Sequence, residues 1–127
     1  MNYNEINNRL KQIKIEDYIW IIYIGIIILS YYSNYLEKKY LLFNNINDKE
    51  KYREIIIIIF TILIFIYYYF LKSSFDDINN LKENDSNEKK ELVYLSFIGS
   101  LLIFISGCIF LYIAFEDNNL DVELAFN

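Results

Sequence analysis

Three long runs without a charged residue constrain this chain more than any other feature of its sequence. They cover residues 18–36, 55–71 and 92–115, and the segments before, between and after them hold all of the Lys, Arg, Asp and Glu residues. A soluble domain interleaves the two kinds of residue to build half-buried helices or strands. A membrane-spanning helix instead needs about 20 mostly apolar residues to cross roughly 30 Å of hydrocarbon. We therefore predict an all-α integral membrane protein with three transmembrane helices, at about 18–36, 55–71 and 92–115.

Strands explain these runs poorly. Strands of globular proteins usually have about five or six residues, and the run 55–71 has seventeen. Strands of a membrane barrel alternate polar and apolar residues, which these runs do not. Separate apolar runs in lipid satisfy their backbone groups as helices. The run 55–71 is short for a span, at about 26 Å.

The N-terminal segment, residues 1–17, has a helical pattern of its own. Tyr3, Ile6, Leu10 and Ile13 recur at spacings of three and four, with polar residues between them. This pattern predicts an amphipathic helix. It lies along the membrane interface, or it is an exposed extension of the first span. At the other end, residues 116–127 form an acidic tail, and the whole chain, 1–127, is expected to be one membrane domain.

Possible capping residues mark where the later helices begin. Asn47, with Glu50 three residues on, resembles a capping box and places the start of the second helix near Asp48. Ser86 or Asp85 is expected to start the third helix.

The composition excludes most catalytic and metal chemistry. The chain has no His and one Cys, which excludes a His-based nucleophile system and a conventional zinc site. Ionisable residues inside a membrane usually mark function, and the three runs contain none. We therefore predict no catalytic residue, no cofactor, no metal ion and no enzyme activity. The net charge of −5, without a basic face, argues against nucleic acid as a partner.

The third run carries a stripe of small residues that is our candidate for a helix-packing or partner face. Small residues let helices in membranes approach closely, and Ser can hydrogen-bond across the contact. The stripe packs on the first two helices of this chain, on a second copy, or on another membrane protein. Its residues are Ser96, Gly99, Ser100, Ile103, Ser106, Gly107, Phe110 and Ala114.

Five aromatic residues are candidate anchors at the membrane interface, where Trp and Tyr are enriched. Three of them are consecutive and point about 100° apart, which favours an aromatic belt over a binding pocket. The five are Tyr18, Trp20, Tyr67, Tyr68 and Tyr69.

The distribution of Lys and Arg predicts the orientation. With three spans, the N-terminal segment and residues 72–91 share one side and hold seven basic residues, against five on the other side. The positive-inside rule then places the N-terminus inside and the C-terminus outside. The basic residues that precede the second run, Lys49, Lys51 and Arg53, favour the opposite orientation, with the N-terminus outside.

These observations leave three classes of function. We expect an accessory, regulatory or immunity-type protein that binds another membrane protein, because this role needs no chemistry. The alternative is a holin-like oligomeric pore former, and a small transporter is disfavoured by the uncharged spans. The expected partners are the lipid bilayer and another membrane protein or the chain itself. Abundant Ile, Asn, Lys, Tyr and Phe suggest a low-GC genome, and hence a bacterial cytoplasmic membrane.

Overall fold

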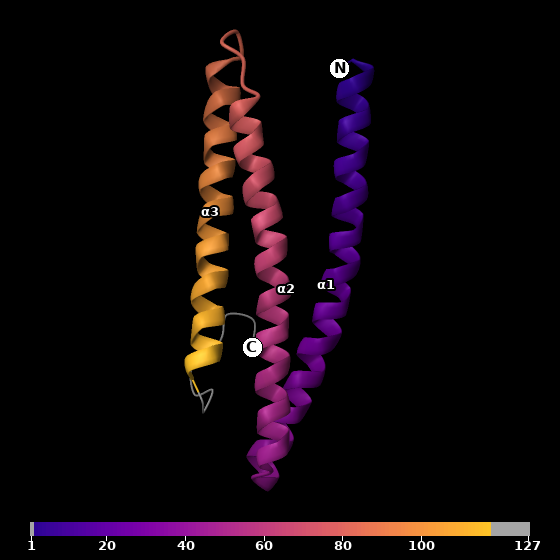
Figure 1. Ribbon diagram of the computed structural model, residues 1–127, viewed down its shortest axis with the longest axis vertical. Coiled ribbons are helices and arrows are strands. Elements are labelled where there is room, and N and C mark those ends of the chain that lie inside the picture. Colours follow the sequence, from indigo (N-terminus) through magenta and orange to yellow (C-terminus); the bar gives the residue numbers. More distant parts are fainter. Residues whose placement is uncertain (1, 118–127) are drawn as a thin grey trace. The chain divides into compact units, whose positions relative to one another are not determined.

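Three long helices make up the described part of the chain. The structure, a computed structural model, describes residues 2–117. Its helices are α1 (Tyr3–Phe43), α2 (Ile46–Asn79) and α3 (Asn87–Glu116) (Figure 1). The all-helical prediction is thus confirmed, and each predicted span lies within one helix. Most of the acidic tail, residues 118–127, lies outside the described residues.

The chain divides into two compact units, Met1–Tyr52 and Arg53–Asn127. The first contains α1 and the first two turns of α2. The second contains the rest of α2 together with α3.

The N-terminal segment is helical and continues without a break into the first predicted span. Asn2 caps α1, because its side-chain oxygen accepts the Glu5 backbone N–H at 2.8 Å while the Glu5 carboxylate accepts the Asn2 N–H at 3.4 Å. This reciprocal pair is a capping box built on Asn. A helix was expected here whether the segment is an interfacial helix or an extension of the first span. The location of the segment along a membrane interface stays a prediction.

The turn between α1 and α2 shows that the predicted start of the second helix was two residues late. Asn44 ends α1 in the left-handed conformation, with φ 52° and ψ 34°, and donates its N–H to the Tyr40 carbonyl at 2.8 Å. The side chain of Asn45 then accepts the Asn47 N–H at 3.0 Å, so α2 begins at Ile46. Asn45 performs the capping role that the sequence pattern assigned to Asn47.

The predicted start of α3 is confirmed at Ser86. Its hydroxyl oxygen accepts the Lys89 N–H at 3.1 Å. Before it, α2 continues to Asn79, about two turns beyond Lys72, so that only residues 80–86 connect the two helices. The polar sequence around this connector therefore belongs largely to the helix ends.

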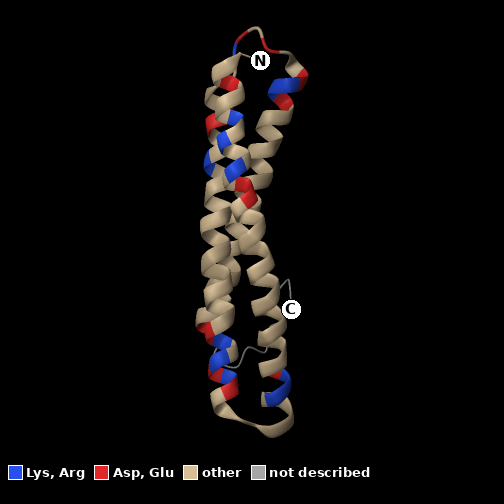
Figure 2. Ribbon diagram, turned by 90° about the vertical axis from the view of Figure 1, so that its right-hand side faces the viewer, with Lys and Arg blue, Asp and Glu red and all other residues tan. Residues whose placement is uncertain are grey.

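Helices α2 and α3 are each long and apolar enough to cross a membrane. Both contain an 18-residue stretch with a mean hydropathy of 2.4, of which 28% is buried in α2 and 11% in α3. With 34 and 30 residues, the helices are about 51 and 45 Å long. The charged residues of both helices lie toward their ends and leave the middle uncharged (Figure 2). The crossing of a membrane by residues 18–36 of α1 stays a prediction.

Candidate functional site: the α2–α3 hairpin

Helices α2 and α3 lie side by side and antiparallel, joined by the short connector (Figure 1). Aromatic side chains meet along their contact. The ring centroids are 6.0, 6.2 and 5.7 Å apart, respectively, in the pairs Phe75–Phe97, Tyr68–Phe104 and Phe60–Phe110. Because the residue number falls on α2 as it rises on α3, these pairs define one continuous register.

A pair of hydroxyl groups links the two helices near the connector. The Ser74 and Ser100 oxygens are 2.8 Å apart, and the Ser74 hydroxyl donates to the Phe70 carbonyl at 2.9 Å. A serine hydroxyl has a single proton, so Ser100 must be the donor to Ser74. The buried Ser74 side chain is thereby satisfied as donor and as acceptor.

The two helices pack closely at Gly107. This residue is buried, and a Cβ atom added to it would lie 2.9 Å from Cδ2 and 3.1 Å from Cε2 of Tyr67. The Ile64 side chain would be 3.5 Å away. The Tyr67 ring therefore packs on the α3 backbone, in a space that a side chain at position 107 would fill.

At the end of the hairpin opposite the connector, Arg53 of α2 hydrogen-bonds to the last turn of α3. Its Nε donates to the Ala114 carbonyl at 3.3 Å, and its Nη2 donates to the Phe115 carbonyl. The last four carbonyls of a helix have no partner within it, and a cation there interacts favourably with the helix dipole. One side chain of α2 thus satisfies two terminal carbonyls of α3.

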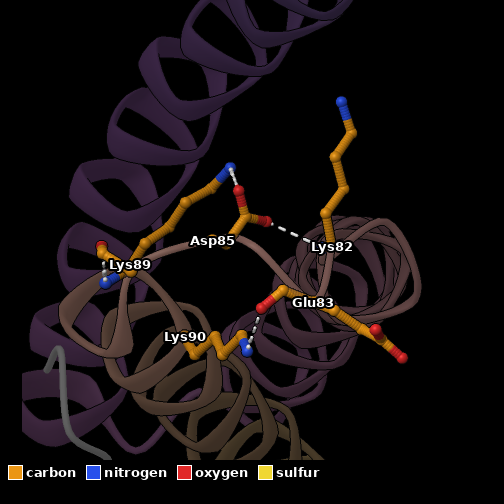
Figure 3. A network of polar contacts seen from close by, with 6 residues as sticks. Lys82, Glu83, Asp85, Lys89 and Lys90 are labelled. Atoms are coloured by element: carbon orange, nitrogen blue, oxygen red, sulfur yellow. Dashed lines mark hydrogen bonds and ion pairs between the residues drawn. The ribbon is translucent and has the colours of Figure 1, made fainter.

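A polar network orders the connector at the other end (Figure 3). The Asp85 carboxylate accepts the Lys82 backbone N–H at 2.8 Å and the Lys89 ammonium at 3.2 Å. The Lys90 ammonium donates to the Glu83 carbonyl at 3.1 Å. The backbone hydrogen bond from Lys82, together with the nearby Lys89 charge, lowers the pKa of Asp85 below its ordinary value.

The predicted stripe divides into two groups of residues. Ser100, Gly107, Phe110 and Ala114 are buried or half-buried, and each of the first three contacts α2 through an interaction described above. The other four residues are exposed: Ser96, Gly99, Ile103 and Ser106. The side of α3 that meets α2 therefore turns away from these four residues, toward Phe97 and Phe104.

Sequence reasoning missed Phe97 and Phe104 as contact residues because it searched for small side chains. Nearly every residue of α3 between 92 and 115 is apolar, so no polar face shows which side packs. Their spacing of three and four from Ser100 and Gly107 was the available signal.

An apolar groove runs beside the close contact. It has a volume of about 460 Å³. Its lining residues are Phe60, Leu63 and Tyr67 of α2 with Leu102, Ile103, Ser106, Gly107 and Phe110 of α3. The exposed residues Ile103 and Ser106 of the stripe thus line the same hollow as Gly107 and Tyr67, which contact each other.

A second hollow, of about 400 Å³, lies near the connector. Its lining combines acidic, basic and apolar side chains: Asp77, Ser86, Glu88, Lys89, Leu92, Val93 and Ser96. Among the described residues, no group of three or more His, Cys, Asp or Glu residues is placed to hold a metal ion.

The five aromatic residues predicted to be anchors differ in their surroundings. Tyr67 packs on Gly107, Tyr68 is 54% exposed, and Tyr69 contacts the Phe70 ring edge-on at 5.3 Å. In α1, Tyr18 and Trp20 are exposed. The role of these residues as interfacial anchors stays a prediction.

Comparisons of the chain with protein-family models, with curated proteins and with solved structures find no match. The contact surface between α2 and α3 consists of aromatic rings, hydroxyl groups and a glycine.

Proposed function

We propose that this chain is a small integral membrane protein that acts as an accessory, regulatory or immunity-type partner of another membrane protein. The observation that carries the proposal is the hairpin of two long apolar helices, in which α3 leaves many of its large apolar side chains exposed. The proposed location is a bacterial cytoplasmic membrane, crossed three times with the N-terminus inside.

The exposure of apolar side chains supports a lipid environment. A core helix of a soluble protein hides its apolar residues, whereas only 11% of the most apolar stretch of α3 is buried. Large side chains such as Ile98, Leu102, Ile105 and Ile109 are exposed on it. Exposed apolar patches beyond a few hundred Å² mark interaction or membrane surfaces, and hydrocarbon would cover these side chains.

The groove supports recognition of another membrane protein. Its lining includes the exposed residues Ile103 and Ser106 and the buried Gly107. In lipid, helix association depends on close packing and on interhelical hydrogen bonds. A partner helix seated in the groove would gain both, with the Ser106 hydroxyl as a hydrogen-bonding group.

The proposal is tested by purifying the tagged protein in mild detergent and by following the membrane potential on expression. We expect a foreign membrane protein to copurify at a fixed stoichiometry and the membrane potential to stay unchanged.

A substitution tests whether the groove is the binding site. Ser106→Leu, which fills the groove, should release the partner. Cys108→Leu is the matched control, because it adds bulk at an exposed position about 200° around the same helix. Equal retention of the partner by both variants would exclude the groove as the binding site.

A holin-like pore is the second candidate, and the exposed Ser96, Gly99 and Ser106 favour it. Small residues left uncovered on α3 would allow copies of the chain to pack together. This function predicts a homo-oligomer and loss of membrane potential. Depolarisation by a homo-oligomer, without a foreign partner, would overturn the accessory role. A small transporter, the third class, is disfavoured because the predicted spans lack the charged residues that commonly mark a pathway inside a membrane.

A further inference from the structure

We draw no further inference here: the strongest candidate, the exposed apolar patch that Leu41, Leu42, Phe43 and Ile46 form at the turn between α1 and α2, carries nothing because nothing in the structure shows what covers it.

Discussion

Gly99 and Gly107 lie two helical turns apart on α3, yet their surroundings differ sharply. A Cβ atom at Gly107 would collide with the Tyr67 ring at 2.9 Å, whereas one at Gly99 would meet nothing within 4 Å. In helices, glycine costs about 1 kcal/mol relative to alanine. The same substitution at the two positions should therefore have effects of opposite sign.

We predict that Gly107→Ala lowers the free energy of unfolding by about 1–3 kcal/mol, the usual cost of overpacking. Gly99→Ala should raise it by up to about 1 kcal/mol. Denaturant or thermal unfolding in detergent measures both. Equal effects of the two substitutions would show that the Gly107–Tyr67 contact does not hold the hairpin together.

Arg53 yields a second prediction at the residue scale. Arg53→Ala removes the donor to the Ala114 and Phe115 carbonyls, so the last turn of α3 should fray, at a cost of about 1.5 kcal/mol. Hydrogen exchange should accelerate at the Asp117 amide, which donates to the Ile113 carbonyl. Lys51→Ala, which removes an exposed base two residues earlier, is the control. Unchanged exchange at Asp117 in the Arg53 variant would contradict the contact.

At the scale of the elements, the connector depends on the ionised Asp85. Its pKa is lowered from 3.8, first by the Lys82 backbone hydrogen bond. A group with a lowered pKa in the folded state contributes stability above its unfolded pKa and loses it as the pH falls through the folded pKa. The contribution of Asp85 is therefore fully present near neutral pH and disappears below pH 3.8.

We predict that Asp85→Asn lowers the unfolding temperature at neutral pH, and that the difference from the natural sequence shrinks as the pH falls below 3.8. Thermal unfolding in detergent over a series of pH values measures this. Glu83→Gln is the matched control, because the hydrogen bond from Lys90 uses the Glu83 backbone carbonyl. A difference that is constant with pH would mean that the Asp85 charge does not order the connector.

The helices could be predicted because their signals are local. Uncharged runs and capping residues are read directly from the sequence, and of the two caps predicted for α3, Ser86 and Asp85, the structure has Ser86. The start of α2 was placed near Asp48 instead of Ile46 because the sequence offers four possible capping residues within five positions. They are Asn44, Asn45, Asn47 and Asp48. Only the left-handed turn at Asn44 decides among them.

The packing face of α3 was harder to predict than the helix itself. A surface helix of a soluble protein shows its core face by a stripe of apolar residues, and α3 is apolar all round. Small residues were then the only pattern, and they occur on both sides of the helix. Arg53 contacts Ala114, which lies 61 positions later in the sequence. Tyr67 contacts Gly107, which lies 40 positions later. A local sequence pattern does not reveal contacts between residues so far apart.

For the whole molecule, the number of spans is the first property to establish. Three spans place the two ends of the chain on opposite sides of the membrane, whereas two spans, α2 and α3 alone, place them on the same side. We predict that a reporter active only in the cytoplasm gives a signal when fused before residue 1 and none when fused after residue 127. Signals from both fusions would exclude the crossing by α1.

The most direct test of the membrane proposal uses the single cysteine, Cys108, which lies exposed within the uncharged run 92–115 of α3. A protein in water would present this thiol to any reagent, whereas hydrocarbon would shield it. We predict that a membrane-impermeant maleimide fails to label Cys108 in intact or opened membranes and labels it after denaturation. The control is a cysteine at connector position 84 (Asn84→Cys in a Cys108→Ser background), which should react from one side. Rapid labelling of Cys108 without denaturation would contradict the placement of α3 in a bilayer.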